Sequence, residues 1–343
     1  MANLTNCNVI KKDFLIYKLH FTTPLHLGDA RDDYSISLKS VASDTMYAAL
    51  TSSLAKIGKA IPPNGDLGFT ISSLFPFYQK DTKSNTVLFF PRPYKKININ
   101  IEDPLVNAKM IKRIAWLDVD YFNKVINNED IFLEHASLNT EYLTDKVIDE
   151  KFIMSDVSPR VKVPRDYSVI KDATPFYMDR IYFKDYSGLY FIVSGDVNLL
   201  NTALDILQYE GIGTDRNVGN GQFIYDTDHI VIDLPIEKDT QFALSLSMFI
   251  PESKKQLNTM LTGENVGYDF ARRGGWITTP PFNTYRKNAI YAFTHGSVFS
   301  RKMVNTVEIM GKIVDLSPDK EDVVDVGHSI WRNGKSFFVP IVV

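Results

Sequence analysis

The sequence predicts an α+β protein built from two units in tandem, and three observations support this prediction. The 343-residue length exceeds what one hydrophobic core usually serves, since domains average about 150 residues. Aromatic residues make up 12% of the chain, and this many Tyr and Phe residues favour sheets over helical bundles. Strand-like alternation and helix-like spacing follow one another along the chain. We therefore expect one unit over residues 1–236 and a second over residues 237–343.

The first unit opens with a strand and continues with a helix. Residues 14–21 alternate between the two faces with the period of a half-buried strand. Ser43 is a favourable N-cap for the helix that follows, and apolar residues recur there every three to four positions. Gly58 is the expected end of this helix.

Two further strands, a helix and a last strand complete the first unit. Residues 176–183 and 189–194 are expected to pair as a hairpin. Asp196 caps the next helix, Gly211 ends it, and residues 223–225 form a strand. The order strand, helix, strand, strand, helix, strand is that of a ferredoxin-like (RRM-like) domain.

A large insertion is expected within this first domain, over about residues 60–172. It opens with a turn-forming Pro-Pro-Asn-Gly segment and holds a short strand over residues 86–90. The spacing of apolar residues over 109–126 indicates a helix, but no alternating series of strands follows.

The second unit is rich in strands. Residues 242–250 alternate cleanly, as in a half-buried strand, and a helix is expected over residues 254–260. Asn333-Gly334, between residues 329–332 and 335–339, is the strongest short-range hairpin signal in the chain. We expect a second ferredoxin-like domain here.

Composition excludes several classes of protein. The 38 Lys and Arg residues against 41 Asp and Glu give a net charge of −3, which excludes a polycationic surface but not a local nucleic-acid site. A single cysteine, Cys7, allows no intramolecular disulfide and no zinc site with two thiolates. No apolar run approaches the roughly 20 residues that span a bilayer, and no signal-peptide pattern opens the sequence. We expect a soluble, cytoplasmic protein.

No catalytic or cofactor signature survives inspection. Gly334-Lys335-Ser336 lacks the upstream glycine of a phosphate-binding loop. Gly211-Ile212-Gly213 is followed by Arg216 where a dinucleotide fingerprint needs its third glycine. The six histidines show no metal-binding spacing, and no Gly-x-Ser-x-Gly elbow occurs. The sequence therefore predicts a protein without metal, cofactor or catalytic residues.

A glycine-rich loop lies between the second helix and the last strand of the first unit. Its four glycines free the backbone to approach a ligand, its N–H groups can form an anion site, and its arginine can pair with a phosphate. The alternative is a long connection whose glycines only adopt positive φ angles. The expected contacts are Gly211, Gly213, Arg216, Asn217, Gly219, Asn220 and Gly221.

Three basic stretches without acidic residues accompany the loop. Cations that grip phosphates, with aromatic side chains that stack on unpaired bases, are the composition of a single-stranded RNA site. Each stretch alone is better explained by a solvated surface, but their combination with the loop favours RNA. One stretch covers residues 89–96. The other two provide the expected contacts Arg160, Lys162, Arg165, Arg272, Arg273, Trp276, Arg286 and Lys287.

Several segments resemble a known family. The loop at residues 211–221 resembles the glycine-rich loop of the RAMP proteins of CRISPR systems. Four further segments are similar to the fourth subunit of the type III-A effector, the Csm complex. They are TTPLHLG at residues 22–28, SDTMYAAL at 43–50, GGW at 274–276 and HGSVF at 295–299.

The resemblance implies a scaffold without catalytic activity. In this family the subunit holds the repeat-derived 5′ tag of the CRISPR RNA (crRNA), and it joins the large polymerase-like subunit to the repeated backbone subunit. By this resemblance the loop holds the tag backbone, while Arg160, Lys162 and Arg165 lie against the RNA. The insertion resembles a thumb wedged between tag and guide.

Two other functions stay open at this stage. A metal-independent RNA endonuclease that processes CRISPR repeat transcripts needs a general base, and His26, beside the turn at Gly28, is the one candidate. His26 is also an expected RNA contact. A protein-interaction scaffold that touches no RNA is the other alternative. The loop and the basic stretches favour an RNA-binding subunit over both.

Overall fold

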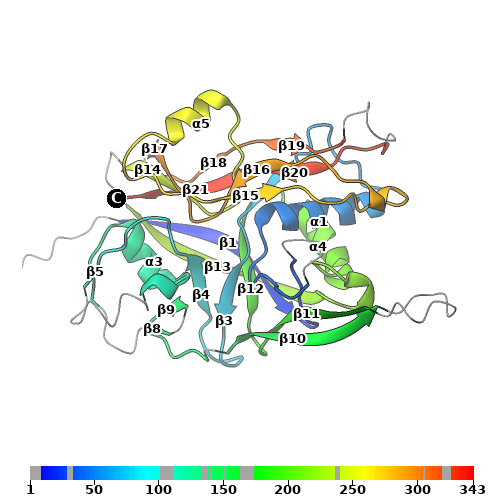
Figure 1. The fold of residues 1–343 in the computed structure, drawn as a ribbon. Helices are drawn as coiled ribbons and strands as arrows, with labels where there is room; N and C mark the ends of the chain where they lie inside the picture. The colour runs from blue at the N-terminus through cyan, green and yellow to red at the C-terminus, as the bar shows by residue number, and fades with distance from the viewer. Residues whose placement is uncertain are drawn as a thin grey trace, which may run out of the picture.

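Strands and helices alternate along both halves of the chain, so the protein is α+β, as the sequence predicts. The computed structural model describes residues 9–28, 34–100, 111–132, 138–139, 141–149, 151–162, 174–235, 240–303, 306–318 and 326–343. The C-terminal strands lie above the central sheet in Figure 1. Within these ranges every helix is too short or too polar to span a bilayer.

A nine-stranded sheet forms the centre of the molecule. Helices α1 (Ser43–Lys56) and α4 (Val197–Glu210) pack against each other, and α4 also contacts β13. β1, α1, β12, α4 and β13 follow one another in the predicted order, but the predicted strand at residues 176–183 is not part of this sheet. In spatial order the strands are β13 (Phe223–Pro235), β1 (Val9–Phe21), β12 (Gly188–Gly195), β3 (Phe75–Tyr78), β4 (Val87–Pro91), β6 (Trp116–Asp118), β9 (Tyr142–Leu143) and β8 (Leu138–Asn139), with β2 (Phe69–Ile71) also paired to β12.

Local sequence signals define the ends of both helices. Gly58 follows the last turn of α1 with φ = 75°, a conformation that glycine adopts without strain. The carboxylate of Asp196 accepts the N–H groups of Asn198 and Leu199 as the N-cap of α4. Gly211 ends α4 with φ = 77°. These predictions are confirmed.

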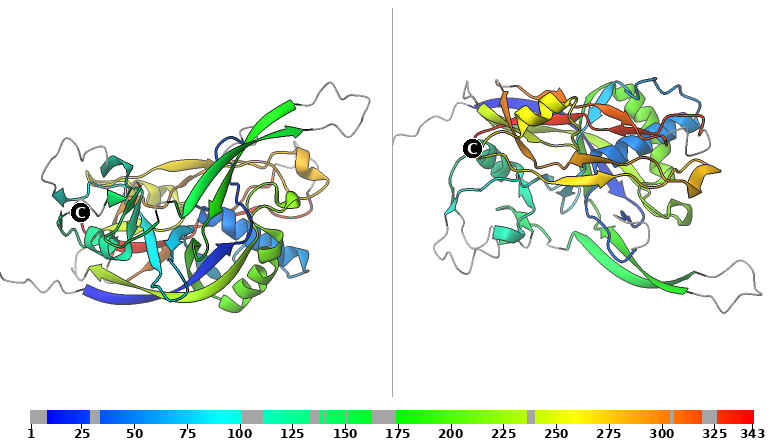
Figure 2. Two further views of the ribbon diagram at one scale, coloured as in Figure 1. Left: turned by 90° about the horizontal axis from the view of Figure 1, so that it is seen from below. Right: turned by 45° about the horizontal axis from the view of Figure 1, so that its top comes forward.

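The predicted hairpin between residues 176–183 and 189–194 is wrong. β11 (Thr174–Phe183) pairs instead with β10 (Ile153–Lys162), in an antiparallel ribbon that projects from the body of the protein (Figure 2). Both edges of β12 are already occupied, by β1 on one side and by β2 and β3 on the other. The turn signal between the two segments is genuine, but it cannot tell which strand pairs with which.

Part of the predicted insertion belongs to the central sheet, since β2, β3, β4 and β6 fall within residues 60–172. β4 confirms the strand predicted over residues 86–90. The helix predicted over 109–126 is wrong in part, because Trp116–Asp118 is a strand and α3 spans only Val119–Ile126. The carboxylate of Asp118 accepts the N–H of Tyr121 at 3.0 Å and so caps α3. Two short strands, β5 (Ile99–Asn100) and β7 (Ile131–Phe132), pair in parallel.

The C-terminal half forms a second sheet of four strands. The helix predicted over residues 254–260 is confirmed as α5 (Lys254–Met260). In spatial order the strands are β17 (Val298–Met303), β14 (Thr240–Ser245), β21 (Ser336–Ile341) and β18 (Glu308–Met310). Two further pairs are β15 (Phe270–Arg273) with β16 (Ile290–Phe293), and β19 (Ile313–Asp315) with β20 (Trp331–Asn333).

The predicted hairpin around Asn333-Gly334 is also wrong. β20 pairs with β19, whereas β21 pairs with β14 and β18. Gly334 serves close packing rather than a two-residue turn: its carbonyl accepts the N–H of Ile250 at 3.0 Å, and a Cβ on it would lie 2.4 Å from the Cβ of Ile250. A glycine needed for close approach and a glycine needed for a turn carry the same sequence signal.

One apolar core runs through both halves of the chain. Leu244, Val298 and Phe337 of the second sheet are buried in the same cluster as side chains of β1, α1 and β12. The two halves therefore share a core, and each half stabilises the other by burial of apolar surface.

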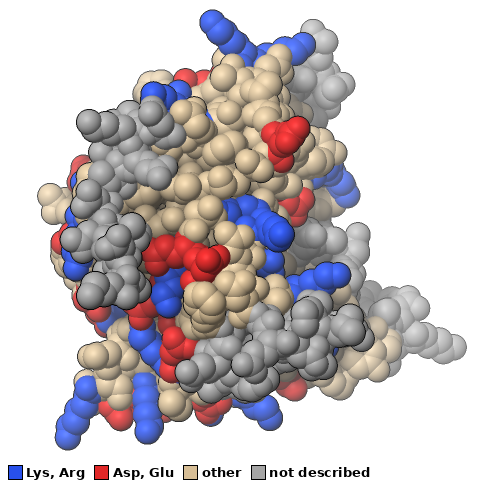
Figure 3. Space-filling model, turned by 90° about the vertical axis from the view of Figure 1, so that its left-hand side faces the viewer, with Lys and Arg blue, Asp and Glu red and all other residues tan. Residues whose placement is uncertain are grey.

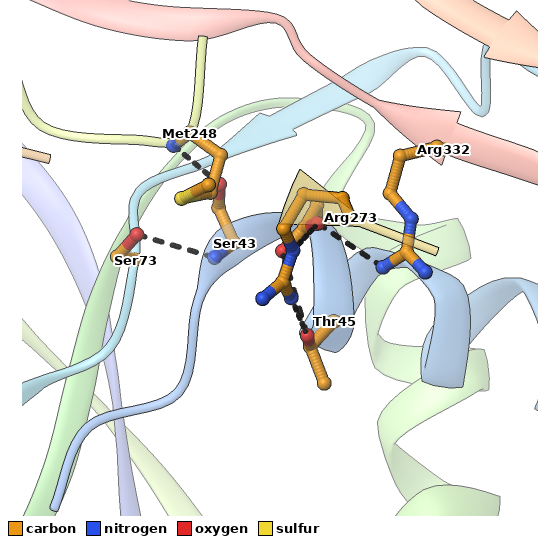
Figure 4. Close-up of polar contacts among 7 residues, drawn as sticks. Ser43, Thr45, Ser73, Met248, Arg273 and Arg332 are labelled. Atoms are coloured by element: carbon orange, nitrogen blue, oxygen red, sulfur yellow. Dashed lines mark hydrogen bonds and ion pairs between the residues drawn. The ribbon is translucent and has the colours of Figure 1, made fainter. Parts of the chain in front are cut away.

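A buried ion-pair cluster at the first turn of α1 joins the two halves (Figure 4). Arg273 of β15 donates to both carboxylate oxygens of Asp44, at 2.6 and 2.9 Å, and Arg332 of β20 donates at 3.1 Å. Although burial alone raises the pKa of Asp44, the adjacent Arg332 and Arg273 hold that pKa below its usual value. The carboxylate is thus charged and fully paired.

Ser43 reinforces this junction, but it does not cap α1 as predicted. Ala42 occupies the N-cap position and makes no side-chain cap. The hydroxyl of Ser43 instead accepts the N–H of Met248, at 2.9 Å, from the second half of the chain. Its own N–H donates to the hydroxyl of Ser73 at 3.1 Å.

His295 forms a second contact between the halves. Its ring packs against Phe75 of β3 and Trp116 of β6, with centroids 5.6 and 6.4 Å away. Its Nδ1 is buried and has no hydrogen-bond partner among the described residues. Burial lowers the pKa of His295 to about 4, so the ring is neutral at neutral pH.

We predict that Asp44→Asn lowers the free energy of unfolding by about 3–5 kcal/mol, because it leaves two buried guanidinium groups without their carboxylate. Urea denaturation of the full chain measures this change. Asp185→Asn, in the exposed turn between β11 and β12, is the control and should change the stability by less than about 0.5 kcal/mol. Equal effects of the two substitutions would contradict the structural role of Asp44.

We also predict that the free energy of unfolding falls as the pH is lowered from 6.5 to about 4. The unfolded chain protonates His295 near its ordinary pKa of 6.5, whereas the folded chain does not until about 4. The unfolded state therefore binds more protons in this window, and folding loses as much as about 3 kcal/mol across it. Urea titrations at several pH values measure the free energy of unfolding. Between pH 6.5 and 4 this free energy should change less with pH in His295→Gln than in the unsubstituted protein. An unchanged slope would show that His295 does not titrate as its burial implies.

Candidate nucleic-acid interface

The glycine-rich loop, residues 211–221, is tied to the segment that follows β1. The N–H of Gly221 donates to the carbonyl of Pro24 at 2.8 Å, and the N–H of Thr214 donates to the carbonyl of His26 at 3.0 Å. The N–H of Ile212 donates to the carbonyl of Gly221 at 2.9 Å and closes the neck of the loop. Residues 213–219 reach solvent, whereas residues 211, 212, 220 and 221 are buried, and we call residues 214–219 the tip.

Three of the four loop glycines are required by this packing. A Cβ on Gly211 would lie 2.4 Å from the carbonyl oxygen of Asn220, one on Gly213 would lie 2.3 Å from that of His26, and one on Gly221 would lie 1.9 Å from that of Ile212. The close approach that the sequence predicts is therefore made to the protein's own backbone at these three positions. This packing explains the three glycines of the neck without a ligand, and their contact with a ligand stays a prediction.

Gly219 differs from the other three. It has φ = 87°, but a Cβ on it would meet no atom within 4 Å. Its neighbours Asn217 and Val218 are exposed, and they belong to the short 3-10 helix Arg216–Val218. Among the described residues, the guanidinium of Arg216 has no hydrogen-bond or ion-pair partner. The tip thus presents an open backbone position and a free cation.

The β10–β11 ribbon is anchored to the same segment as the loop. Leu25 and Ile181 exchange backbone hydrogen bonds of 2.9 and 2.8 Å. The carboxylate of Asp179 accepts the N–H of Ser37 at 2.9 Å and the hydroxyl of Ser155 at 2.5 Å. Residues 22–27 therefore lie between the neck of the loop and the base of the ribbon. We call these residues the strut.

A row of rings leads from the strut along the ribbon. His26 stacks on Tyr34 with ring centroids 5.7 Å apart, and Tyr34 contacts Phe176 at 5.5 Å. Phe176 lies directly across from Arg160 in the β10–β11 pairing, and cross-strand partners share one face of a ribbon. Aromatic surface and a cation therefore occur together on this face.

His26 does not fit the roles predicted for it. His26 is 1% exposed, and the carbonyl oxygen of Asp179 accepts a hydrogen bond of 2.7 Å from its Nδ1. Its Nε2 is also buried. A general base or a direct RNA contact must reach the ligand, so the prediction of His26 as either is wrong, and His26 is a structural residue of the strut.

The ribbon carries two of the three cations predicted in its stretch. Arg160 is half-buried, and Lys162 is the last residue of β10. Arg165 lies outside the described residues. The ribbon that carries them extends away from the rest of the protein in both views of Figure 2.

The C-terminal basic stretch divides into two kinds of side chain. Arg272 is exposed on β15, and the guanidinium of Arg286 lies 4.9 Å from the centre of the Trp276 ring. Arg273 points the other way, to Asp44 and to the hydroxyl of Thr45 at 2.6 Å. The Nε and Nη2 donors of Arg273 are bound within the protein, so its role as an RNA contact stays a prediction. Lys287 is half-buried.

Two of the three cations in the basic stretch at residues 89–96 bind within the protein, whereas Lys96 is exposed. Arg92 donates to the carbonyl of Ile111 at 2.6 Å, and Lys95 donates to the carbonyl of Val342 at 2.7 Å. Burial lowers the pKa of Lys95 to about 8. Among the described residues of the face drawn in Figure 3, basic and acidic side chains are interspersed.

Sequence reasoning missed the residues that hold the strut. Tyr34, Phe176 and Asp179 carried no motif, and the aromatic pattern of residues 176–183 was consistent with a core hairpin as well as with an exposed ribbon. Their role depends on the pairing of β10 with β11, which spacing alone does not predict. Among the described residues no group of three or more His, Cys, Asp or Glu side chains could hold a metal ion.

The family model and the curated proteins that this chain resembles are all described as Csm4. The family model for the CRISPR Csm4 C-terminal domain matches residues 238–341. The protein "CRISPR system Cms protein Csm4" of Streptococcus thermophilus is 25% identical over 340 residues, which cover 96% of this chain and all of that protein. Its namesake from Mycobacterium tuberculosis (strain CDC 1551 / Oshkosh) is 22% identical and covers 92% of this chain and 94% of its own.

Solved structures share the fold. A Csm1–Csm4 cassette in complex with cA4 contains a chain with a TM-score of 0.57 at 16% identity, covering 97% of this chain and 99% of that one. A Csm3–Csm4 subcomplex of a type III-A CRISPR–Cas interference complex gives a TM-score of 0.53 at 16% identity and covers 97% of this chain and 100% of that one. The C-terminal part of this chain therefore matches the Csm4 C-terminal domain model, and nearly the whole chain is similar to curated Csm4 proteins and shares their fold.

Proposed function

We propose that this chain is a non-catalytic, RNA-binding subunit of a type III-A effector that holds the 5′ repeat-derived tag of the crRNA. The observation that carries the proposal is the strut, which ties the neck of the glycine-rich loop and the base of the ribbon to one buried segment. The free cation Arg216 and the ribbon cation Arg160 thereby flank the same segment. Cations with aromatic rings between them suit an unpaired RNA strand.

The proposed RNA contacts are those predicted cations and loop-tip residues that the fold leaves available. The buried position of His26 gives no support to the alternative, an RNA endonuclease. The contacts are Arg160, Lys162, Arg165, Arg216, Asn217, Gly219, Asn220, Arg272, Trp276 and Arg286. Asn220 lies outside the tip and is buried, and it belongs to the proposed set because its Nδ2 has no partner among the described residues.

We also propose that the chain bridges the large polymerase-like subunit and the backbone subunit of a cytoplasmic effector complex. Solved relatives occur as a Csm1–Csm4 cassette and as a Csm3–Csm4 subcomplex. In the proposed domain scheme, residues 1–236 are a ferredoxin-like domain with an insertion over about 60–172, and residues 237–343 are a second one. Mixing the purified subunits tests the bridge, because the large and backbone subunits should co-elute on size-exclusion chromatography only when this chain is added.

We predict that reversing the ribbon charges, with Arg160→Glu, Lys162→Glu and Arg165→Glu together, weakens tag binding most at low salt. Each phosphate contact to a single strand contributes roughly 0.7 to the slope of log affinity against log salt concentration, so the slope should fall by about 2. Fluorescence anisotropy of labelled tag RNA with the assembled complex, at four salt concentrations, measures the slope.

The control for the ribbon variant is a charge reversal of equal size elsewhere. Lys59, Lys254 and Lys255 are exposed and lie outside the ribbon and the loop, so their change to Glu should leave the salt slope within about 0.5 of the unsubstituted value. An RNA of the same length with a scrambled tag is the second control. If the complex binds it as tightly as the tag, this chain does not recognise the tag.

We predict that Gly219→Ala weakens tag binding several-fold while it costs only about 1 kcal/mol of stability. The cost comes from the positive φ, since the added Cβ meets no protein atom but would stand where the RNA backbone approaches. Gly58→Ala is a matched control, because Gly58 also has a positive φ and also faces open space, at the end of α1. Urea denaturation should give similar costs for both, and anisotropy should show weaker RNA binding for Gly219→Ala alone. Equal RNA affinities would show that the tip does not contact the RNA.

A further inference from the structure

The ion-pair cluster at α1 carries more positive charge than its carboxylate can balance. Arg273 and Arg332 both pair with Asp44, and Lys287 lies close enough that the charges of all three residues act on it, Asp44 being the one acidic side chain in the described part of the chain that does so. A structural ion pair needs one cation for one carboxylate. Two positive charges are therefore left over in a partly buried position, which costs free energy unless an anion joins them.

The cluster has a closed floor and an open side. Asp44 and Arg332 are 1% and 8% exposed at their side chains and lie at the bottom. Arg273 is 18% exposed and Lys287 is half-buried, so both reach the side that faces solvent. Figure 4 shows Arg273 and Arg332 converging on the first turn of α1 from two different strands.

Two donors of the cluster lack acceptors. The ammonium group of Lys287 has no hydrogen-bond or ion-pair partner among the described residues, although its backbone N–H is bound to the carbonyl of Gly275. The Nε–H of Arg332 is buried and has no acceptor among the same residues. The N-terminus of α1, a 14-residue helix, adds its positive dipole end at Asp44 and Thr45. Unsatisfied donors, excess charge and a helix N-terminus at one place are the chemistry of an anion site.

We propose that Lys287 and Arg273, together with the N-terminus of α1, bind a phosphate group, above a floor formed by Asp44 and Arg332. A phosphate carries between one and two negative charges near neutral pH, which matches the two excess positive charges. It also accepts several hydrogen bonds, as guanidinium and ammonium donors require. The proposal deepens the RNA-binding function if the phosphate belongs to an RNA strand, and inorganic phosphate tests the site without that assumption.

The ionisation of Lys287 agrees with this geometry. Burial, together with the nearby charges of Arg332 and Arg273, lowers the pKa of Lys287 to about 8, while Asp44 opposes the shift. The folded protein thus holds this lysine in its charged form at a free-energy cost. A bound phosphate would remove that cost and raise the pKa toward its ordinary value.

Thermal unfolding of the full chain at pH 7 tests the proposal, with sodium phosphate compared to sodium chloride at equal ionic strength. At about ten times the dissociation constant, phosphate should raise the midpoint by about 2 °C. Lys287→Gln should abolish this rise and, without phosphate, should melt no lower than the unsubstituted protein, because it relieves the repulsion from two arginines. Lys59→Gln, an exposed lysine elsewhere, should keep the full response.

A merely structural Lys287 would behave in the opposite way. Its substitution would lower the midpoint in chloride and leave the response to phosphate intact, and that result would overturn the proposal. If Lys287→Gln does not fold, the unsubstituted protein labelled with 13C at the lysine Cε decides the matter. The pKa of Lys287 should rise by one unit or more when phosphate is added, and an unchanged pKa would overturn the proposal.

The source of the phosphate is assigned by competition. A short single-stranded RNA that removes the response to inorganic phosphate assigns the site to a phosphodiester. An RNA that leaves the response intact assigns it to a free phosphate or a phosphate monoester. The ribbon charge-reversal variant should keep the response to inorganic phosphate, so failure of tag binding and failure of this site can be distinguished.

Discussion

The buried carboxylate of Asp44 is the constraint on which the relative position of the two halves depends. A carboxylate removed from water must be paired, and its partners come from two strands of the second half, β15 and β20. The pairing therefore places the first turn of α1 against the C-terminal strands. At its other end α1 contacts α4, where Lys56 pairs with Glu210 at 2.7 Å and the hydroxyl of Ser53 donates to the same carboxylate. Gly211 and the glycine-rich loop begin at the next residue, so the position of the loop is tied through α1 to the same carboxylate.

Local signals predicted the helices of this fold better than its strand pairs. Asp196, Gly211 and Gly58 act within a few residues of their own position, so their chemistry is visible in the sequence. Which strands pair depends on which sheet edges are unoccupied, and that is a property of the assembled sheet. The segment 176–183 had the composition of a core strand, yet both edges of β12 were taken, and it pairs with β10. Gly334 carried a turn signal but is required by the approach of Ile250.

The candidate site, like the fold, was predictable where local sequence decides the structure and not where contacts between distant residues decide it. Position, spacing and composition indicated the glycine-rich loop, but only the fold separates Gly219, which faces open space, from the three glycines that pack on the chain itself. Arg272 and Arg273 are adjacent and chemically identical. Successive residues of a strand face opposite sides, so Arg272 is exposed whereas Arg273 meets Asp44, which is 229 residues away. A contact across that separation leaves no trace in the local sequence.

The strut explains how the proposed tag-binding surface can be made from two elements that are far apart in the sequence. Leu25 and His26 are almost fully buried, and Leu27 is 7% exposed, so the segment between loop and ribbon has few alternative conformations. Backbone hydrogen bonds join it to Ile181 on one side and to Gly221 on the other. Binding then requires ordering of the loop tip and of the ribbon side chains, but not of the connection between them. Ordering is a large part of what association costs, so a surface held in this way needs fewer contacts for a given affinity. The glycines of the neck also help to fix this connection before binding, because they let the loop lie close to the strut.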